Sequence, residues 1–410
     1  MAIVSGVRTP FALAGTRLAG LSAAQLGRLA TTELVQRTSL VPARIEQVVF
    51  GRAALDPASP NVAHEIAAAT GLLPAASVHT VTCSCASGYQ AILHVADAIL
   101  AGRIECGLAG ASESATSADG PSRAVRDEEG PRPSRGGGRL GRRSSPPHAE
   151  SRQRPSPEEG AERLARTHGI TRSDQDRFAH RSHQLAARAC REARFEQDVM
   201  PVYVPPSFAP VTHDQSIRSD SSLSDYSRFV PWMGGRQGSV TPGNSAAPAD
   251  GAGAVVLMQE GRARREGVPV LGYVRAAGVV ALGPDEHPLL APAYALPRAL
   301  RQADLRFRDL DVVDLHEAFA AGVLACVSML ESDVFARQHL GRSKRLVGAM
   351  DWDRCNASGG SIAFGHAGAA TGIRQVLQTL RELRRREGRY GLVATSTPDG
   401  LGSALVLEAP

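Results

Sequence analysis

The chain has 410 residues, of which 43% are hydrophobic and 4% aromatic, with 41 glycines, and this length allows two sizeable cores. The formal net charge of +5 is carried almost entirely by arginine. The six cysteines follow neither a disulfide framework nor the spacing of a zinc site, which excludes a disulfide-rich secreted domain and a zinc-binding module.

The first residues lead directly into a predicted strand and show neither a signal-peptide core nor a transit-peptide pattern. The sequence contains no run of about 18 apolar residues, as a membrane-spanning helix would require. We therefore expect a cytoplasmic protein without a transmembrane segment.

Strands and helices are predicted to alternate along residues 1–118. Apolar, β-branched runs predict strands at residues 45–51, 79–82 and 106–111, and a helix is predicted at residues 61–70. This alternation is typical of an α/β fold.

Cys85 lies in a turn of small residues between a predicted strand at residues 78–82 and a predicted helix at residues 91–100. A cysteine at a helix start lies near unpaired N–H groups and the positive end of the helix dipole, which favour the thiolate. The turn therefore indicates a nucleophilic cysteine that works on acyl thioesters. A buried structural cysteine is the alternative.

Residues 119–160 lose periodicity and are rich in Pro, Gly, Ser and Arg, with nine arginines between Arg123 and Arg154. We expect a solvated, mobile insertion here, and the alternative is a site for an anionic partner such as the phosphates of a cofactor. Aromatic residues that would stack on bases are lacking, so we expect no nucleic acid partner. Helical periodicity returns over residues 157–193.

The last third of the chain repeats the pattern of the first. Predicted strands at residues 312–315 and 359–364 lead to a turn of small residues that carries His366, followed by a predicted helix at residues 373–383 and a strand at residues 390–395. A unit used twice predicts two similar α/β halves, with the Cys85 and His366 turns facing one cleft.

The predicted organisation has three parts. Residues 1–118 and about 195–262 form the N-terminal half, residues 119–194 form an inserted region that is loop-like and then helical, and residues 263–410 form the C-terminal half.

Six ordered blocks of the sequence together resemble the thiolase superfamily, and the β-subunit type of the fatty-acid-oxidation trifunctional enzyme in particular. The blocks are Gly6 to Phe11, Thr80 to Ala91, Val240 to Ser245 with Asp250 to Ala252, His316 to Phe319, Asn356 to Gly372 and Tyr390 to Glu408. The resemblance implies duplicated βαβαβαββ halves in a five-layered α-β-α-β-α sandwich. It also implies a homodimer or a dimer of dimers.

The resemblance assigns a role to four side chains. Cys85 would attack a thioester and become acylated, and His366 would take the thiol proton. His316 would help to bind the oxyanion. Ser396 stands where the family carries its second catalytic cysteine.

The resemblance also implies an acyl-coenzyme A substrate in place of a permanently bound cofactor. Asn244, Ser245, Phe319 and Gly400 are the residues expected to contact coenzyme A. No metal is expected, because the His316-Glu317 pair lacks the second histidine of a zincin motif.

The last block departs from the family pattern at three positions. A serine hydroxyl at Ser396 is a poor proton shuttle near neutral pH. Pro398 has no N–H where the resemblance places an oxyanion donor, and Asp399 adds a carboxylate nearby.

Three functions stay open at this point. The first is a thiolase-type acyltransferase of altered or weak activity that makes or breaks a β-ketoacyl-CoA, in lipid or polyketide metabolism. The second is a Cys-His-His acyltransferase or decarboxylative condensing enzyme, and the third is a non-catalytic partner of thiolase fold.

Overall fold

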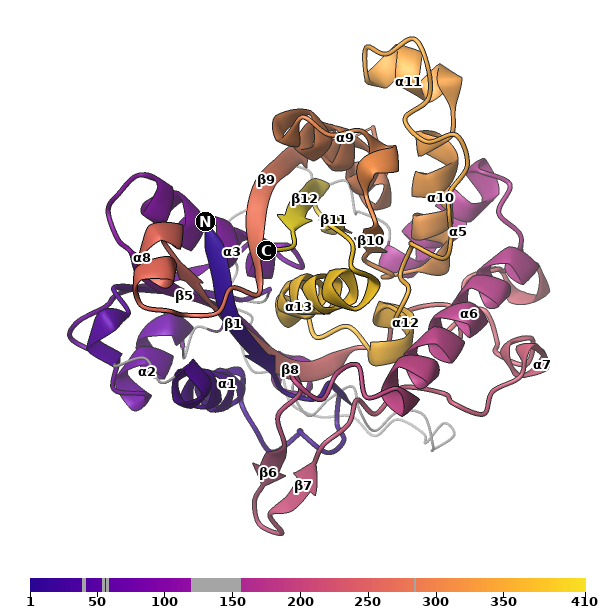
Figure 1. Cartoon of the computed structure of the whole chain (residues 1–410). Coiled ribbons are helices and arrows are strands. Elements are labelled where there is room, and N and C mark those ends of the chain that lie inside the picture. The colour runs from indigo at the N-terminus through magenta and orange to yellow at the C-terminus, as the bar shows by residue number, and fades with distance from the viewer. Residues whose placement is uncertain (39–41, 54–55, 57–58, 119–155, 284) are drawn as a thin grey trace, which may run out of the picture.

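The computed structural model describes residues 1–38, 42–53, 56, 59–118, 156–283 and 285–410 (Figure 1). The expected Arg-rich mobile insertion falls on residues 119–155 and lies outside this range. Among the described residues, no helix is both long and apolar enough to cross a membrane.

The first half is a mixed sheet with helices on both faces. Its strands run in the order β1-β8-β5-β3-β4, with β3 parallel to both β4 and β5, and β8 antiparallel to β1 and β5. The bounds are β1 Ala2–Arg8, β2 Ala12–Leu13, β3 Gln47–Gly51, β4 Ser77–Val81, β5 Cys106–Ser114, β8 Ala249–Met258, α1 Ala23–Thr38, α2 Val62–Ala69 and α3 Ser87–Leu100.

The second half repeats this topology. Its strands run β9-β12-β11-β10, with β10 parallel to β11 and β12 antiparallel to both neighbours. The bounds are β9 Gly272–Ala281, β10 Val312–Leu315, β11 Tyr390–Ser396, β12 Leu401–Glu408, α9 Ala291–Ala303, α10 Ala320–Leu330, α11 Asp333–His339, α12 Ser361–Phe364 and α13 Ala370–Arg386.

The strand predicted at residues 359–364 is wrong, because this run forms the short helix α12. The place of the missing strand is taken by a single parallel bridge between Val313 and Cys355. Asn356 turns the chain directly afterwards with a left-handed φ of 50°, and its side-chain amide pairs with the backbone of Leu315. The hydrogen bonds of Asn356 thus hold the following run of small residues away from the extended conformation of a strand.

The remaining elements connect the halves or cap the sheet. The helical stretch predicted at residues 157–193 forms two helices, separated at Gly169, whose φ is 64°. The bounds are α4 Ala115–Ala118, α5 Pro157–Thr167, α6 Arg172–Arg191, β6 Val202–Val204, β7 Ala209–Val211, α7 Leu223–Tyr226, α8 Glu260–Arg265 and short 3-10 turns at Pro42–Arg44, Gly235–Gln237, Pro288–Leu290 and Phe307–Asp309.

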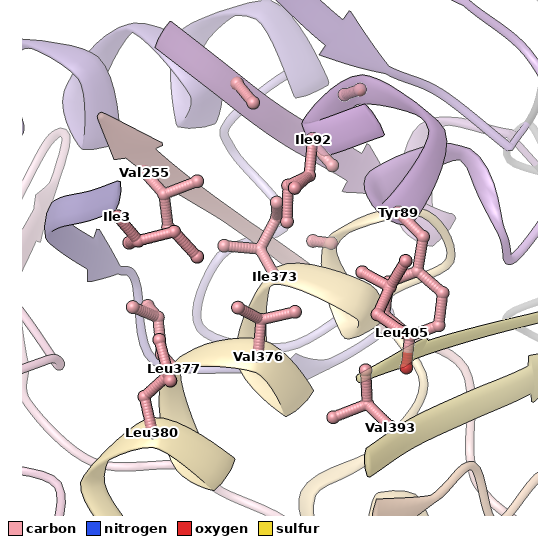
Figure 2. Close-up of a cluster of buried hydrophobic side chains, with 14 of the residues drawn as sticks. Ile3, Tyr89, Ile92, Val255, Ile373, Val376, Leu377, Leu380, Val393 and Leu405 are labelled. Atoms are coloured by element: carbon pink, nitrogen blue, oxygen red, sulfur yellow. The ribbon is translucent and has the colours of Figure 1, made fainter. Parts of the chain in front are cut away.

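The five layers implied by the resemblance are present. Helices α1 and α2 cover the outer face of the first half-sheet, α9 and α10 cover the outer face of the second, and α3 and α13 lie between the two (Figure 1). Side-chain alternation along the strands supports this division, since Val393 of β11 faces the central layer while Leu392 and Ala394 face the outer one. Ile92, Ile373 and Val376 fill the centre (Figure 2).

Helices α3 and α13 approach each other backbone to backbone. A Cβ added to Gly88 would lie 2.4 Å from the carbonyl oxygen of Ala369, and one added to Gly372 would lie 2.9 Å from Cδ1 of Tyr89. Because Cys85 precedes α3 and His366 precedes α13, this close crossing brings the two turns together.

Candidate active site

The Cys85 turn is held in shape by one serine. Ser84 has a left-handed φ of 45°, which turns the chain sharply between β4 and α3. The Ser87 hydroxyl accepts the N–H of Cys83 at 2.8 Å and lies 2.6 Å from the carbonyl oxygen of Ser84. The turn therefore presents Cys85 one residue before Ala86, the N-cap residue of α3, near the helix start that the sequence predicted.

His366 lies against the thiol of Cys85. The distance between Cys85 Sγ and His366 Nε2 is 3.0 Å, and His366 Nδ1 lies 3.0 Å from the Thr371 hydroxyl. The backbone of His366 is fixed by hydrogen bonds with Ala247 and Ala249. The sulfur and the ring nitrogen are thus placed for direct proton transfer.

His316 completes the group from the end of β10. Its ring centroid lies 4.5 Å from that of His366, and its Nδ1 lies 2.9 Å from the Ser361 hydroxyl. Its Nε2 is buried and has no hydrogen-bond partner among the described residues. A buried ring nitrogen that faces a site without a partner is available to a ligand.

The surroundings shift the pKa of each of the three side chains toward its neutral form. Burial raises the pKa of Cys85 to about 12, and the carboxylates of Glu113 and Asp399 act in the same direction. Burial and the charge of Arg374 lower the pKa of His366 to about 4. Burial, His366 and Arg374 hold the pKa of His316 well below its usual value.

The shift of the Cys85 pKa runs opposite to the helix-start effect expected from the sequence. The backbone N–H of Cys85 lowers the thiol pKa, but desolvation outweighs it. Cys85 needs a base to lose its proton, and the neutral Nε2 of His366 is in place to accept it.

A narrow pocket opens beside His316. It brings together His316, Phe319 and Ser396 of the predicted site. Its remaining lining is mostly apolar and comes from β10, α9, α10 and the turn before α9: Leu289, Pro292, Leu315, Ala318, Gly322, Val323 and Cys326.

The two residues predicted to contact coenzyme A at 244 and 245 differ in what they offer. The Asn244 amide donates to Asp176 at 2.9 Å and to the carbonyl oxygen of Ser239 at 3.0 Å, so its donors already bind protein groups. Asn244 therefore shapes the loop. The buried hydroxyl of Ser245 has no partner among the described residues, and the backbone of Ser245 bridges to Phe319.

Two N–H groups of the turn between β11 and β12 bind carbonyl oxygens of the same turn. Thr397 donates to the carbonyl oxygen of Leu401 at 2.9 Å, Gly400 donates to that of Thr397 at 3.0 Å, and Pro398 has no N–H. Gly400 has a φ of 90°, and its carbonyl accepts the N–H of Leu282. Asp399 lies close enough to raise the pKa of both Cys83 and Cys85.

Sequence reasoning missed the residues that support the two histidines. The Ser361 hydroxyl contacts Nδ1 of His316, and the Thr371 hydroxyl contacts Nδ1 of His366. Arg374 in turn donates to the Ser361 hydroxyl. The Glu317 carboxylate accepts hydrogen bonds from the Ser182 hydroxyl at 2.7 Å and from the Asn356 amide at 2.6 Å, and so links these segments. Thr371 lies five residues after His366, a spacing that could have indicated it, whereas Ser361 lies 45 residues from His316 and no local spacing indicates it.

In the part of the chain that the structure describes, one group of side chains could hold a metal ion. Its members are Cys85, His316 and His366, whose ligand atoms lie within 4.8 Å of one another. Sulfur and imidazole nitrogen are donors that suit Zn²⁺. The 3.0 Å between Cys85 Sγ and His366 Nε2 is a hydrogen-bond distance, whereas bonds of ~2.3 and ~2.0 Å to tetrahedral Zn²⁺ would place two such ligands about 3.5 Å apart. The geometry favours a proton-transfer pair.

Comparisons with known proteins cover the whole chain. The family "Thiolase, N-terminal domain" matches residues 1–261, and "Thiolase, C-terminal domain" matches residues 268–409. A 3-ketoacyl-CoA thiolase of Serratia proteamaculans (strain 568) is 42% identical over 421 residues, which span 100% of this chain and 96% of the relative. A 3-ketoacyl-CoA thiolase of Escherichia fergusonii is also 42% identical, over 428 residues, 100% of this chain and 97% of the relative.

Solved structures are similar over the same range. An acetyl-CoA acetyltransferase of Bacillus anthracis has a TM-score of 0.84 at 27% identity, covering 100% of this chain and 98% of that one. Human mitochondrial 3-ketoacyl-CoA thiolase in complex with CoA has a TM-score of 0.84 at 25% identity, with the same coverage.

Proposed function

The chain belongs to the thiolase family and is an acyltransferase of that kind, and we propose that it cleaves or forms β-ketoacyl-CoA through an acyl-Cys85 intermediate. The observation that carries the proposal is the 3.0 Å contact between Cys85 Sγ and His366 Nε2, beside His316 Nε2, which has no partner in the part of the chain that the structure describes. These atoms supply a nucleophile, a base and an oxygen-binding group at one point.

In the cleavage direction, the Cys85 thiol gives its proton to His366 Nε2 as sulfur attacks the 3-keto carbonyl carbon. The carbonyl electron pair moves to oxygen, and His316 lies where it can bind that oxygen. When the carbonyl re-forms, the bond between C2 and C3 breaks, leaving acyl-Cys85 and the enolate of acetyl-CoA, which takes up a proton. The thiol of a second coenzyme A then attacks acyl-Cys85 and releases the Cys85 thiolate, which regains a proton.

We expect the proton transfers and the second attack to be slow in this chain. Ser396 lines the pocket with His316 but carries a hydroxyl in place of the family's second thiol. Pro398 supplies no N–H to the second oxyanion, and loss of one such donor costs about 10²–10³ in rate. Asp399 opposes the negative charge, in line with its effect on the pKa of Cys85.

The test is intact-protein mass spectrometry after mixing with a panel of acyl-CoAs, together with thiolysis assays on β-ketoacyl-CoAs of several lengths. Acylation of the wild type, and none of Cys85→Ala, supports the proposal. Equal labelling of both proteins, or mapping of the acyl group to Cys83, contradicts it.

A second candidate is an acyltransferase or decarboxylative condensing enzyme that uses only Cys85, His316 and His366. The grouping of these three side chains favours it, because loss of CO₂ creates the carbanion without a second thiol. Acyl-Cys85 formation combined with turnover of a malonyl thioester, but not of a β-ketoacyl-CoA, would select this candidate. A non-catalytic partner subunit is disfavoured by the intact contact between Cys85 and His366.

For partners and location we propose a cytoplasmic homodimer, or a dimer of dimers, that binds its acyl-CoA through Ser245 and Phe319. The Ser245 hydroxyl has no partner among the residues that the structure describes, and Phe319 lines the pocket. Among the described strands, β4 is an edge of the sheet that pairs only with β3, is half exposed and comes directly before the Cys85 turn; such an edge is suited to pairing with a second copy. Sedimentation velocity tests the oligomeric state.

A further inference from the structure

In both histidines of the site, Nδ1 contacts a hydroxyl, but the two Nε2 atoms have opposite hydrogen-bonding roles: that of His366 accepts and that of His316 donates. His366 Nε2 must accept the proton of Cys85, so its own ring proton is on Nδ1 and is donated to the Thr371 hydroxyl. His316 Nε2 has no partner among the described residues, and it can bind an oxyanion only if it carries the ring proton.

A chain of hydrogen bonds behind His316 decides where that proton is. Arg374 Nη2 lies 3.4 Å from the Ser361 hydroxyl oxygen, which in turn lies 2.9 Å from His316 Nδ1. A guanidinium only donates, so Ser361 accepts from Arg374, and we infer that its own hydrogen points to Nδ1, the nearest ring nitrogen. A neutral ring that accepts at Nδ1 must hold its proton on Nε2, facing the pocket.

Arg374 is itself held firmly in place. It is 1% exposed, donates to the Gln378 side chain at 2.7 Å and lies 3.8 Å from the Asp314 carboxylate. Its guanidinium carbon lies 5.1 Å from the centre of the Phe364 ring. A buried, always protonated side chain at this point also disfavours a charged His316, which keeps the ring in its neutral form.

We propose that Ser361 and Arg374 are positioning residues that fix His316 as an Nε2–H donor to the substrate oxyanion, the tautomer opposite to that of His366. The proposal rests on the proposed function for the identity of the oxyanion. The assignment of the tautomer depends only on the hydrogen bonds.

The first test reads the tautomer directly, by ¹⁵N NMR of the histidine rings in protein labelled at histidine. We expect the His316 ring of the wild type to carry its proton on Nε2, and the Ser361→Ala variant to show the Nδ1–H form or a mixture. Ser403→Ala is the matched control, since it removes another fully buried hydroxyl that has no partner among the described residues. An Nδ1–H ring in the wild type, or an unchanged ring in Ser361→Ala, overturns the proposal.

The role of Arg374 is tested in the same spectra. Arg374→Lys keeps a group that only donates hydrogen bonds, so we expect the His316 ring to keep the wild-type tautomer. Arg374→Met lets the Ser361 hydroxyl reorient, so we expect a mixture of the two His316 tautomers. Circular dichroism checks that both variants fold. A folded Arg374→Met with the wild-type ring spectrum removes Arg374 from the proposal, and if that variant does not fold, Arg374→Leu replaces it under the same criterion.

The second test is a double-mutant cycle on acylation kinetics. In the wild-type background Ser361→Ala should lower kcat about 10²-fold with little change in KM, because the oxyanion donor is lost for most molecules. In the His316→Asn background the same change should cost less than about threefold, since an amide donor has no tautomer to fix. Equal losses in both backgrounds would mean that Ser361 has only a structural role. If the wild type does not turn over, the proposed function fails and the ring spectra alone decide this inference.

Discussion

Cys85 and His366 form a pair that is neutral until substrate arrives. The pKa of the thiol is raised to about 12 and that of the imidazole is lowered to about 4, both chiefly by burial. Neither group ionises alone near neutral pH, so the reaction must couple proton transfer to nucleophilic attack. The short contact between Sγ and Nε2 provides the route.

This coupling predicts an unusual pH profile. Acylation requires neutral His366, so the rate should fall only as pH drops through about 4 and should be flat from about pH 5 to 8. Single-turnover acylation by acetyl-CoA, followed by mass spectrometry, checks this. An acid limb near pH 6.5, the ordinary value for histidine, would contradict the neutral-pair description.

The two histidines should differ in how strongly they affect the first step. We expect His366→Ala to slow Cys85 acylation about 10²–10⁴-fold, the usual contribution of a general base. His316→Ala should have a smaller effect, because water can replace part of an oxyanion contact. Single-turnover acylation rates of the two variants decide the order, and the reverse order would show that the roles are exchanged.

The turn after β11 should limit thiolysis independently of Cys85. We expect weak wild-type cleavage of acetoacetyl-CoA, no recovery in Ser396→Cys or Pro398→Gly alone, and recovery when both are combined. The thiol restores a proton shuttle, and the glycine restores an N–H donor. Thiolysis rates of the four proteins measure this; rapid cleavage by the wild type would refute the argument.

At the scale of elements, the site depends on how closely α3 and α13 cross. A Cβ on Gly88 would meet the Ala369 carbonyl oxygen at 2.4 Å, and neither backbone can yield without moving its helix. That movement would separate the Cys85 and His366 turns, which precede these helices.

Gly88→Ala should therefore lower the free energy of unfolding by about 1–3 kcal/mol and reduce acylation as well. Gly348→Ala is the matched control, because its added Cβ would meet nothing within 4 Å. Urea denaturation with parallel acylation assays measures both effects. Equal stability of the two variants would mean that the helices adjust without cost.

At the scale of the whole molecule, histidines with a lowered pKa make the fold sensitive to acid. Burial and Arg218 lower the pKa of His183 to about 3, and His316 and His366 are shifted in the same direction. The unfolded chain takes up protons on these rings as pH falls below about 6.5, whereas the folded chain does so only near or below pH 4. Stability should thus be fully present above pH 6.5 and decline below it.

His183→Gln isolates this effect away from the reacting atoms, since His183 Nδ1 accepts the backbone N–H of Arg218. We expect a shallower fall in Tm between pH 6.5 and 4.5 than in the wild type. His64→Gln, at an exposed position on α2, should leave the slope unchanged. Identical slopes in all three proteins would show that His183 does not contribute.

Local sequence patterns sufficed for most of the fold. Periodicity predicted the central strands and helices to within a few residues, and the repeated turn motif predicted that Cys85 and His366 face each other. The exception, residues 359–364, is a run of small residues without a strong preference for either structure, so long-range hydrogen bonds decided it. The role of the Arg-rich segment 119–155 stays a prediction.

The sequence by itself determined which chemical groups the site contains, because residue type and local spacing place them on turns at the ends of strands. The tertiary structure decided what state those groups are in. Desolvation raises the pKa of the partly buried Cys85 thiol, against the helix-start effect that the sequence suggested. Ser361 and Arg374, 45 and 58 positions beyond His316, orient its ring proton. Ionisation and tautomer depend on solvation and on hydrogen-bond partners, and both come from segments that are distant in the chain and meet only when it folds.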